Sequence, residues 1–291
     1  MHRRHSMSDY QQTGYLNTDF RMFHLTDTRL KPIAFHYHDF HKILIVLKGS
    51  VSYCVEGRTY ELLPGDIVFV PAGDVHRPIL RDESTYERII IYISRDYLAN
   101  YCNDAYDLEL CLKEAHQKRS HVLRVPTFAT SRLAQIAREL EHALESDGYA
   151  NGLYQNLLFL EFMIHLNRAL LRDGIEYLTN SASNQKMLSV IDYLNTHITE
   201  DISIDCLADT FYLSRYHLMH TFKEETGYTI GNYITAKRLL LARQLLDQGH
   251  PITTVCYECG FHNYSTFSRA YHKHYGCSPR EHLTFTAPSS Y

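Results

Sequence analysis

The fold of the C-terminal part is decided by GFHNYSTFSRAYHKHYGCSP, residues 260–279. Between its two glycines lies a helix-sized segment in which Phe267, Ala270 and Tyr271 recur at helical spacing and would share a buried face. The opposite face carries polar side chains, namely Ser265, Ser268, Arg269 and His272. A helix that keeps such a face out of the core presents it either to solvent or to a polar partner.

An internal repeat favours the polar partner. The segment LADTFYLSRYHLMHTFKEETGYT (207–229) matches VCYECGFHNYSTFSRAYHKHYGCS (255–278), with one residue added in the turn. Each copy predicts a short helix, a turn and a longer helix that ends at Gly227 or Gly276, in the left-handed position. This is a helix-turn-helix, whose longer helix can enter the major groove of DNA and bind base edges. A solvated face on an ordinary helical bundle is the alternative.

The first copy predicts the same two-faced helix. Ser214 stands at its N-cap position, and Leu218, Thr221 and Phe222 face inward. The outward side chains are Tyr216, Met219, His220 and Lys223.

The segment between the two copies, TIGNYITAKRLLLARQLLDQG (229–249), also has apolar residues at helical spacing. We expect one helix that holds the two modules apart, so that their reading helices reach successive major grooves roughly 34 Å from each other. The regular part ends in SPRE (278–281), where Ser278, Pro279 and Glu281 form a capping-box pattern.

Residues 184–283 resemble the DNA-binding domain of the AraC/XylS family of bacterial transcription regulators, above all at 260–279, which is similar to the family signature around the second reading helix. Three departures from the family pattern, at Cys256, at His272 and in the REHL ending (280–283), weaken the expected phosphate contacts more than the fold. The resemblance implies double-stranded DNA as a partner. It also implies these DNA-binding residues: Ser214, Arg215, Tyr216, Met219, His220, Lys223, Asn263, Tyr264, Ser265, Ser268, Arg269 and Lys273.

Arg269 is the strongest candidate for base readout, because a guanidinium can donate to both acceptors of guanine. Its alternative role is a surface salt bridge. The net charge of −4 means that any basic surface is local, so binding by one chain should be moderate, which favours a homodimer. The candidates for phosphate contacts are Lys223, Lys237, Arg238, Lys273 and Arg280.

The N-terminal part, from about residue 20 to 93, reads as short β-runs such as KILIVLKG and GDIVFVPAG between turn residues, which predicts a closed or double-sheet β domain. HYHDFHKILIVLKG (36–49) and GDIVFVPAGDVH (65–76) resemble the two-part motif of the cupin β-barrels. Lys42 stands where that motif has glutamate. The matching positions are His36, His38, Gly49, Gly65, Pro71, Gly73 and His76.

The residues His36, His38 and Lys42 share parity along an extended chain, so all three would project from one face, where His76 can join them. Three neutral imidazoles could bind zinc, iron or nickel, but the ammonium of Lys42 would repel a cation. We therefore expect no metal and no cofactor, and a ligand site for a small polar effector, a sugar or an anionic sugar derivative. In the alternative, Lys42 extends to the rim and the histidines satisfy one another.

The expected fold class is α+β multidomain. A cupin-like ligand-binding domain with an N-terminal arm (1–125) is followed by a helical dimerisation region (126–178), the polar linker TNSASNQ (179–185) and an all-α domain with two helix-turn-helix motifs (186–291). The dimerisation role is implied by resemblance to regulators that pair these domains. The helical pattern there rests on Leu133, Ile136, Ala137, Leu140 and Leu144, and then on Leu157, Leu160, Ile164 and Leu171.

The sequence has no apolar run of the length that a membrane span requires and no secretory signal pattern, so we expect a cytoplasmic protein without a membrane partner. Its seven cysteines form no disulfide framework, and Cys256 and Cys259 should be buried thiols of a helix.

Three functions compete. The favoured one is a ligand-responsive, sequence-specific transcription regulator without enzymatic activity, an activator of a carbohydrate or small-metabolite operon that works with RNA polymerase. The second is a metal-dependent cupin enzyme, an isomerase or oxygenase with an accessory helical domain, against which stand the duplicated helix-turn-helix and the missing glutamate. The third is a DNA-binding protein whose barrel serves only to dimerise.

Overall fold

The computed structural model consists of two compact units, one over residues 12–183 and one from Asn184 onward, each with its own hydrophobic core. The expected N-terminal arm and most of the expected linker lie outside the described residues. The structure describes residues 16, 18–28, 32–80, 85–171, 175–179 and 184–286.

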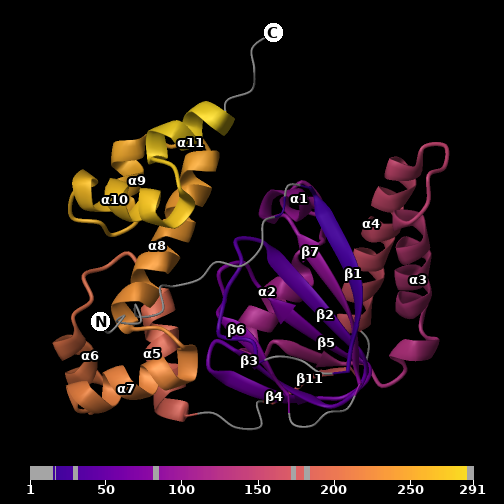
Figure 1. Cartoon of the computed structure of the whole chain (residues 1–291), viewed down its shortest axis with the longest axis horizontal. Helices are drawn as coiled ribbons and strands as arrows, with labels where there is room; N and C mark the ends of the chain where they lie inside the picture. Colours follow the sequence, from indigo (N-terminus) through magenta and orange to yellow (C-terminus); the bar gives the residue numbers. More distant parts are fainter. Residues whose placement is uncertain are drawn as a thin grey trace, which may run out of the picture. The chain divides into compact units, whose positions relative to one another are not determined.

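The first unit is a double-sheet β structure of the cupin-like kind (Figure 1). Among the described residues, one six-stranded sheet has the order β1-β7-β2-β5-β10-β11, a three-stranded sheet has the order β4-β3-β6, and β8 and β9 pair separately. The last strand, β11, follows the helices and extends the six-stranded sheet. The strands are β1 (Phe20–Asp27), β2 (His41–Lys48), β3 (Val51–Val55), β4 (Arg58–Leu62), β5 (Asp66–Val70), β6 (His76–Leu80), β7 (Tyr86–Ile93), β8 (Cys102–Asn103), β9 (Tyr106–Asp107), β10 (Val122–Arg124) and β11 (Glu176–Tyr177).

The two faces of β2 explain its continuous apolar run. Successive side chains of a strand alternate between faces. Leu44 and Val46 belong to the core between the two sheets, whereas Ile43 and Ile45 belong to the core beneath the helices. Both faces are thus covered, and a strand buried on both faces does not alternate polar and apolar residues. Lys42 has the parity of Leu44 and therefore lies on the inter-sheet side.

Helices cover the outer face of the six-stranded sheet, where Phe159 and Phe162 pack fully buried against Ile91 and its neighbours. In Figure 1, α3 and α4 run side by side next to the strands. The helices are α1 (Arg95–Ala99), α2 (Leu110–Gln117), the 3-10 helix η1 (Phe128–Thr130), α3 (Arg132–Leu144) and α4 (Asn151–Leu170).

A second apolar face of α4 remains exposed. Leu153, Leu157 and Ile164 expose 62%, 56% and 39% of their surface, the C-cap residue Leu171 directly after the helix exposes 76%, and Leu160 is half-buried. In chain order, the first four are four, three and four residues apart and Leu171 follows one heptad after Ile164, which is the spacing of a coiled-coil seam; we call these five residues the α4 seam. The periodicity correctly predicted a helix here, but most of the apolar residues that revealed it do not face the protein core.

The second unit is helical throughout its described residues. The expected capping box is confirmed, because the backbone N–H of Ser278 donates to Glu281 (2.6 Å) and that of Glu281 donates to the Ser278 hydroxyl (3.2 Å). Cys256 and Cys259 are buried free thiols, as expected. The helices are α5 (Gln185–Thr196), α6 (Ile204–Thr210), α7 (Arg215–Thr226), α8 (Ile230–Asp247), α9 (Ile252–Glu258), α10 (Tyr264–Tyr275) and α11 (Pro279–Thr286).

The predicted ends of both longer helices are confirmed. The hydroxyl of Ser214 accepts from the backbone N–H of His217 at 3.2 Å, which makes it the N-cap of α7. Gly227 and Gly276, at φ 78° and 74°, end α7 and α10 in the left-handed conformation. No helix among the described residues has the length and apolar character needed to cross a bilayer.

The first unit should lose stability in mild acid. Burial, reinforced by the charge of Arg58, lowers the pKa of His121 to about 4. The unfolded chain binds a proton at this histidine below about pH 6.5, while the folded chain does not, so stability is complete above pH 6.5 and falls as the pH drops towards 4. We expect a loss of about 2 kcal/mol in the free energy of unfolding at pH 5 from this residue alone.

Denaturant titrations at pH 7 and pH 5 measure this loss. In the His121→Gln chain the difference between the two titrations should be smaller by that amount. His116→Gln, which changes an exposed histidine nearby, is the control and should leave the difference intact. Equal pH dependence in both variants would contradict the assignment.

Candidate DNA-binding surface and ligand site

The reading face of α7 points away from the core of its unit. Leu218 and Phe222 are fully buried, which turns the opposite side of the helix outward. Tyr216 and Met219 expose 75% and 47% of their surface. All six candidate residues of this module are exposed: Ser214, Arg215, Tyr216, Met219, His220 and Lys223.

The second module repeats this arrangement on α10. Phe267 and Tyr271 are fully buried. The side chain of Asn263 caps the helix by accepting from the backbone N–H of Thr266 at 2.8 Å. The exposed candidates are Asn263, Tyr264, Ser265, Arg269 and Lys273, and Ser268 is half-buried.

The connecting helix α8 holds the two modules apart. It has 18 residues, which makes it about 27 Å long at about 1.5 Å per residue. α7 lies near its beginning and α10 near its end (Figure 1). This length is of the order of one turn of DNA, which is roughly 34 Å.

Several candidate cations have partners within the protein. Arg215 forms an ion pair with Asp205 of α6, and the Nδ1 atom of His220 lies 3.2 Å from a carboxylate oxygen of Glu224. The Nε atom of Arg269 donates to the backbone oxygen of Ser265 at 3.2 Å, which lays this side chain along α10.

The expectation for Arg238 is wrong. Its guanidinium donates to three backbone carbonyls, those of Ile198, Glu200 and Gly260, instead of being available for phosphate. Lys237 is half-buried, with its ammonium 5.3 Å from the ring centre of Tyr233. Of the other phosphate candidates, Lys223, Lys273 and Arg280 are exposed.

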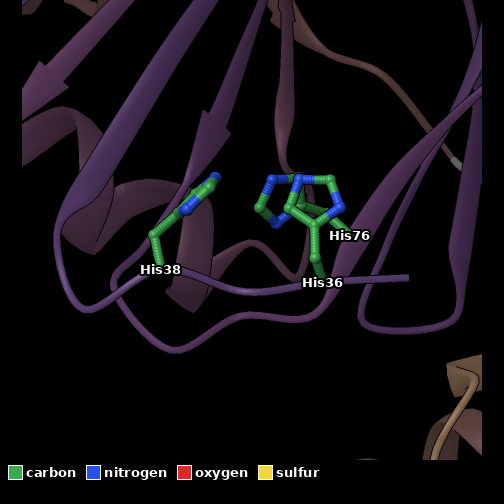
Figure 2. Close-up of side chains that lie close together, drawn as sticks. All are labelled: His36, His38 and His76. Carbon is green, nitrogen blue, oxygen red and sulfur yellow. The ribbon is translucent and has the colours of Figure 1, made fainter. Parts of the chain in front are cut away.

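The first unit brings its four predicted ligand-binding residues together. His36 and His76 form an antiparallel backbone bridge, with N···O distances of 3.1 and 2.8 Å. Their rings lie 4.3 Å apart between centroids, and the ring of His38 is 5.0 Å from that of His76 (Figure 2). From β2, the Nζ atom of Lys42 lies 3.4 Å from Nε2 of His76 and donates to the Tyr53 hydroxyl at 3.0 Å.

Lys42 does not extend to the rim. It is 5% exposed, so the alternative in which its ammonium reaches water is wrong. Burial, and after it the charge of Arg88, lowers the pKa of Lys42 to about 7. A substantial neutral fraction is therefore present at pH 7, and a ligand that carries negative charge would favour the ammonium form.

The hydrogen bonds of the histidines fix which nitrogen carries the proton. Nδ1 of His36 lies 2.9 Å from the carbonyl of Ala34, and Nδ1 of His76 lies 2.9 Å from that of Asp74. A carbonyl only accepts, so both Nδ1 atoms are protonated and both Nε2 atoms keep a lone pair. Burial lowers the pKa of His36 to about 4 and that of His76 well below its usual value. Both imidazoles are thus neutral acceptors at pH 7.

This cluster satisfies part of a metal-site geometry. One nitrogen from each of His36, His38 and His76 lies within 4.8 Å of the others. The Lys42 ammonium next to His76, however, places a cation donor where a metal ion would need a vacant approach. A second grouping, Cys102, Asp107 and Glu109, is already occupied by ion pairs, since Lys113 lies 2.6 Å from Asp107 and 3.0 Å from Glu109.

Two polar residues of the inter-sheet side were not predicted from the sequence. Tyr53 of β3 accepts the hydrogen bond from Lys42, and Arg88 of β7 lies 2.6 Å from Asp27. Their signal was present, because Arg88 has the same strand parity as Tyr92, which pairs with Lys42 across β2 and β7. Parity along β7 alone could not show that Arg88 lies on the same side as Lys42, because that also requires knowing that β7 pairs with β2.

Comparisons with known proteins match both units. A family profile for an AraC-like ligand binding domain matches residues 24–163, and one for a helix-turn-helix domain matches residues 207–284. The HTH-type transcriptional activator RhaS of Shigella boydii serotype 18 is 29% identical over 250 residues, which cover 84% of this chain and 86% of RhaS. RhaS of Escherichia coli (strain SMS-3-5) is 28% identical over the same length.

Among solved structures, ToxT from Vibrio cholerae is similar over 93% of this chain and 100% of its own, with 14% identity and a TM-score of 0.37. The two profiles follow one another in the order of the two units, and the RhaS proteins span both. A sensor-like β unit and a duplicated helix-turn-helix with outward reading faces are thus joined in one chain, which belongs to the AraC family of transcription regulators.

Proposed function

We propose that this regulator activates a carbohydrate or small-metabolite operon when a hydroxylated, negatively charged effector binds between its two sheets. The observation that carries the proposal is the cluster of one ammonium and neutral imidazole acceptors formed by buried Lys42 and His76 and half-buried His36. The relatives are named as transcriptional activators, which supports activation, with RNA polymerase as the partner, in the cytoplasm.

The donors and acceptors of the cluster suit such an effector. The Nε2 lone pair of His36 accepts from a hydroxyl group. The ammonium of Lys42 faces Tyr53 and Nε2 of His76 and donates its third proton to a carboxylate or phosphate oxygen. A sugar acid or sugar phosphate offers both kinds of group. A catalytic role is not favoured, and stoichiometric iron or manganese in the purified protein would reopen it.

In the proposed complex with DNA, the side chains of α7 and α10 divide into two roles. Arg269 reads a base pair, supported by the other exposed residues of the reading faces. Lys223, Lys273 and Arg280 contact phosphates, which fixes position without reading sequence.

We further propose a homodimer formed through the α4 seam. Four of its five side chains are more than a third exposed although they are large and apolar. The seam has the period of a coiled coil, so the same seam of a second copy fits it. A dimer also doubles the DNA contacts of a protein whose net charge is −4.

The function is tested by selection from a random duplex library with the full chain, followed by footprinting with and without sugar acids, sugar phosphates and neutral sugars. We expect one enriched sequence with protection of two successive major grooves, and a change of occupancy or of transcription with an effector. Protection that no small molecule alters would favour the barrel as a dimerisation device only.

Replacement of Lys42 by Met should abolish the preference for charged effectors. The buried ammonium makes a charge-assisted hydrogen bond to the effector, so its loss should weaken binding of a uronate or sugar phosphate by about 10- to 100-fold, while neutral sugars change little. Because the pKa of Lys42 is about 7, wild-type affinity should be highest below pH 7 and fall above it.

Calorimetric titrations at pH 6 and pH 8 check both expectations. Lys48→Met, on the same strand but exposed, is the matched control and should bind as wild type does. A preference for neutral sugars that persists in the Lys42→Met chain would end the anionic-effector proposal.

A further inference from the structure

One arginine contacts both the loop that leads into the first helix-turn-helix module and the turn of the second module. Arg238 of α8 donates from Nε to the carbonyl of Ile198 at 2.7 Å, from Nη2 to that of Glu200 at 2.6 Å, and from Nη1 to that of Gly260 at 2.6 Å. Ile198 and Glu200 belong to the loop between α5 and α6, which leads into the first module. Gly260 lies in the turn of the second module, between α9 and α10.

The same two segments touch at two further points. Gly260 has φ +81°, and a Cβ atom there would lie 2.6 Å from the backbone oxygen of Thr199 and 2.9 Å from Cζ of Arg238. The close approach of these backbones thus requires glycine. Beside it, the Nε2 atom of His262 lies 3.6 Å from a carboxylate oxygen of Asp201.

A connecting helix alone would fix how far apart the modules are, but less firmly how they are rotated about its axis. A guanidinium is planar and rigid, and its charge-assisted bonds to three carbonyls tie the loop that enters the first module and the turn of the second module to α8 in one orientation. We propose that Arg238 is a positioning residue that locks the two reading helices in one rotational register, so that the protein selects the spacing of its two DNA subsites.

The proposal rests on the proposed binding of DNA by both modules. It concerns the distance between the two DNA subsites that the protein accepts, and not the bases that it reads. Insertion of one base pair between the subsites turns the second by about 34° and moves it by about 3.4 Å. Modules locked in one register cannot follow this change without strain, whereas modules released from the lock can follow it at lower cost.

The test uses the full chain and a duplex that wild type selects from a random library of about 40 base pairs, long enough for roughly four turns. Dissociation constants are measured for this duplex and for derivatives with one base pair inserted between the two protected grooves. We expect wild type to lose about 100-fold in affinity upon insertion, and Arg238→Met to lose no more than about 5-fold. Arg238→Lys, which keeps the charge but not the planar fork, should fall between them.

Arg243→Met is the matched control, because Arg243 lies on the same helix, where it contacts Asp247 of that helix and the ring of Tyr275 of α10. This control should keep the wild-type ratio between the dissociation constants of the inserted duplex and the selected duplex. A merely structural role of Arg238 would lower affinity for every duplex and leave the ratio unchanged, which overturns the proposal. So does failure of both Arg238 variants to fold, as judged by thermal melting. If wild type selects no duplex at all, it is the proposed function that fails.

Discussion

A chain with Leu157→Lys and Ile164→Lys is expected to be monomeric and to bind its selected duplex about 100-fold more weakly than wild type. Both residues lie on the α4 seam and expose 56% and 39% of their surface. Two lysines at seam positions one heptad apart face the seam of a second copy, so like charges and lost apolar burial together oppose pairing. The DNA-binding unit of the other copy is then no longer held near the DNA at a high effective concentration.

Sedimentation measures the mass, and mobility shift measures the affinity. Tyr106→Lys places the same charge on another exposed apolar residue, 55% exposed, and should leave both unchanged. The double variant should retain the wild-type melting temperature of the isolated chain, since neither side chain is part of the buried core. A dimer that survives both substitutions would show that another surface pairs the chains.

The second large effect separates base reading from phosphate contact on α10. Arg269→Ala should reduce discrimination at one base pair by about 1–3 kcal/mol, because a bidentate contact to one guanine is lost. Lys273→Ala should instead weaken all sequences alike and reduce the slope of log affinity against log salt by about one. Both residues are exposed on the same helix, so each serves as the control for the other.

Binding to every single-base variant of the selected duplex, at several salt concentrations, checks this division. Uniform loss of affinity in both variants would mean that Arg269 contacts the backbone, or that its bond to the Ser265 carbonyl holds it away from the bases.

The helical unit was largely predictable, because each of its signals is local. The buried pair Phe267 and Tyr271 follows from helical spacing, and Ser214 and Gly227 mark the ends of α7 through backbone hydrogen-bonding and φ requirements that hold in any context. Because the motif is duplicated, the helix ends and buried face predicted for one copy can be tested against those predicted for the other. Arg238 escaped prediction, since its three acceptors are backbone carbonyls far away in sequence, which no side-chain pattern reveals.

The β unit was predictable in class but less so in its polar interior. The prediction that His36, His38 and Lys42 lie together is correct, although residues 38–40 are not part of a strand and parity along an extended chain is therefore not the reason. Parity also gave no information on whether Lys42 would reach water. Its burial depends on Tyr53, which comes from the opposite sheet. In α4, periodicity identified a helix but could not distinguish the core face from the seam, because both are apolar.

The glycines of the cupin-like motif have a structural reason that is independent of ligand chemistry. Gly49 has φ +97°, and a Cβ atom there would lie 2.5 Å from the backbone oxygen of Thr85. The corresponding distance at Gly65 is 2.6 Å, to the backbone oxygen of Val125. Neither position tolerates a side chain, whatever occupies the interior. The backbone alone therefore requires glycine at these two positions, so an exchange of interior residues, such as lysine at position 42 where the cupin motif has glutamate, leaves the glycine spacing of the motif unchanged.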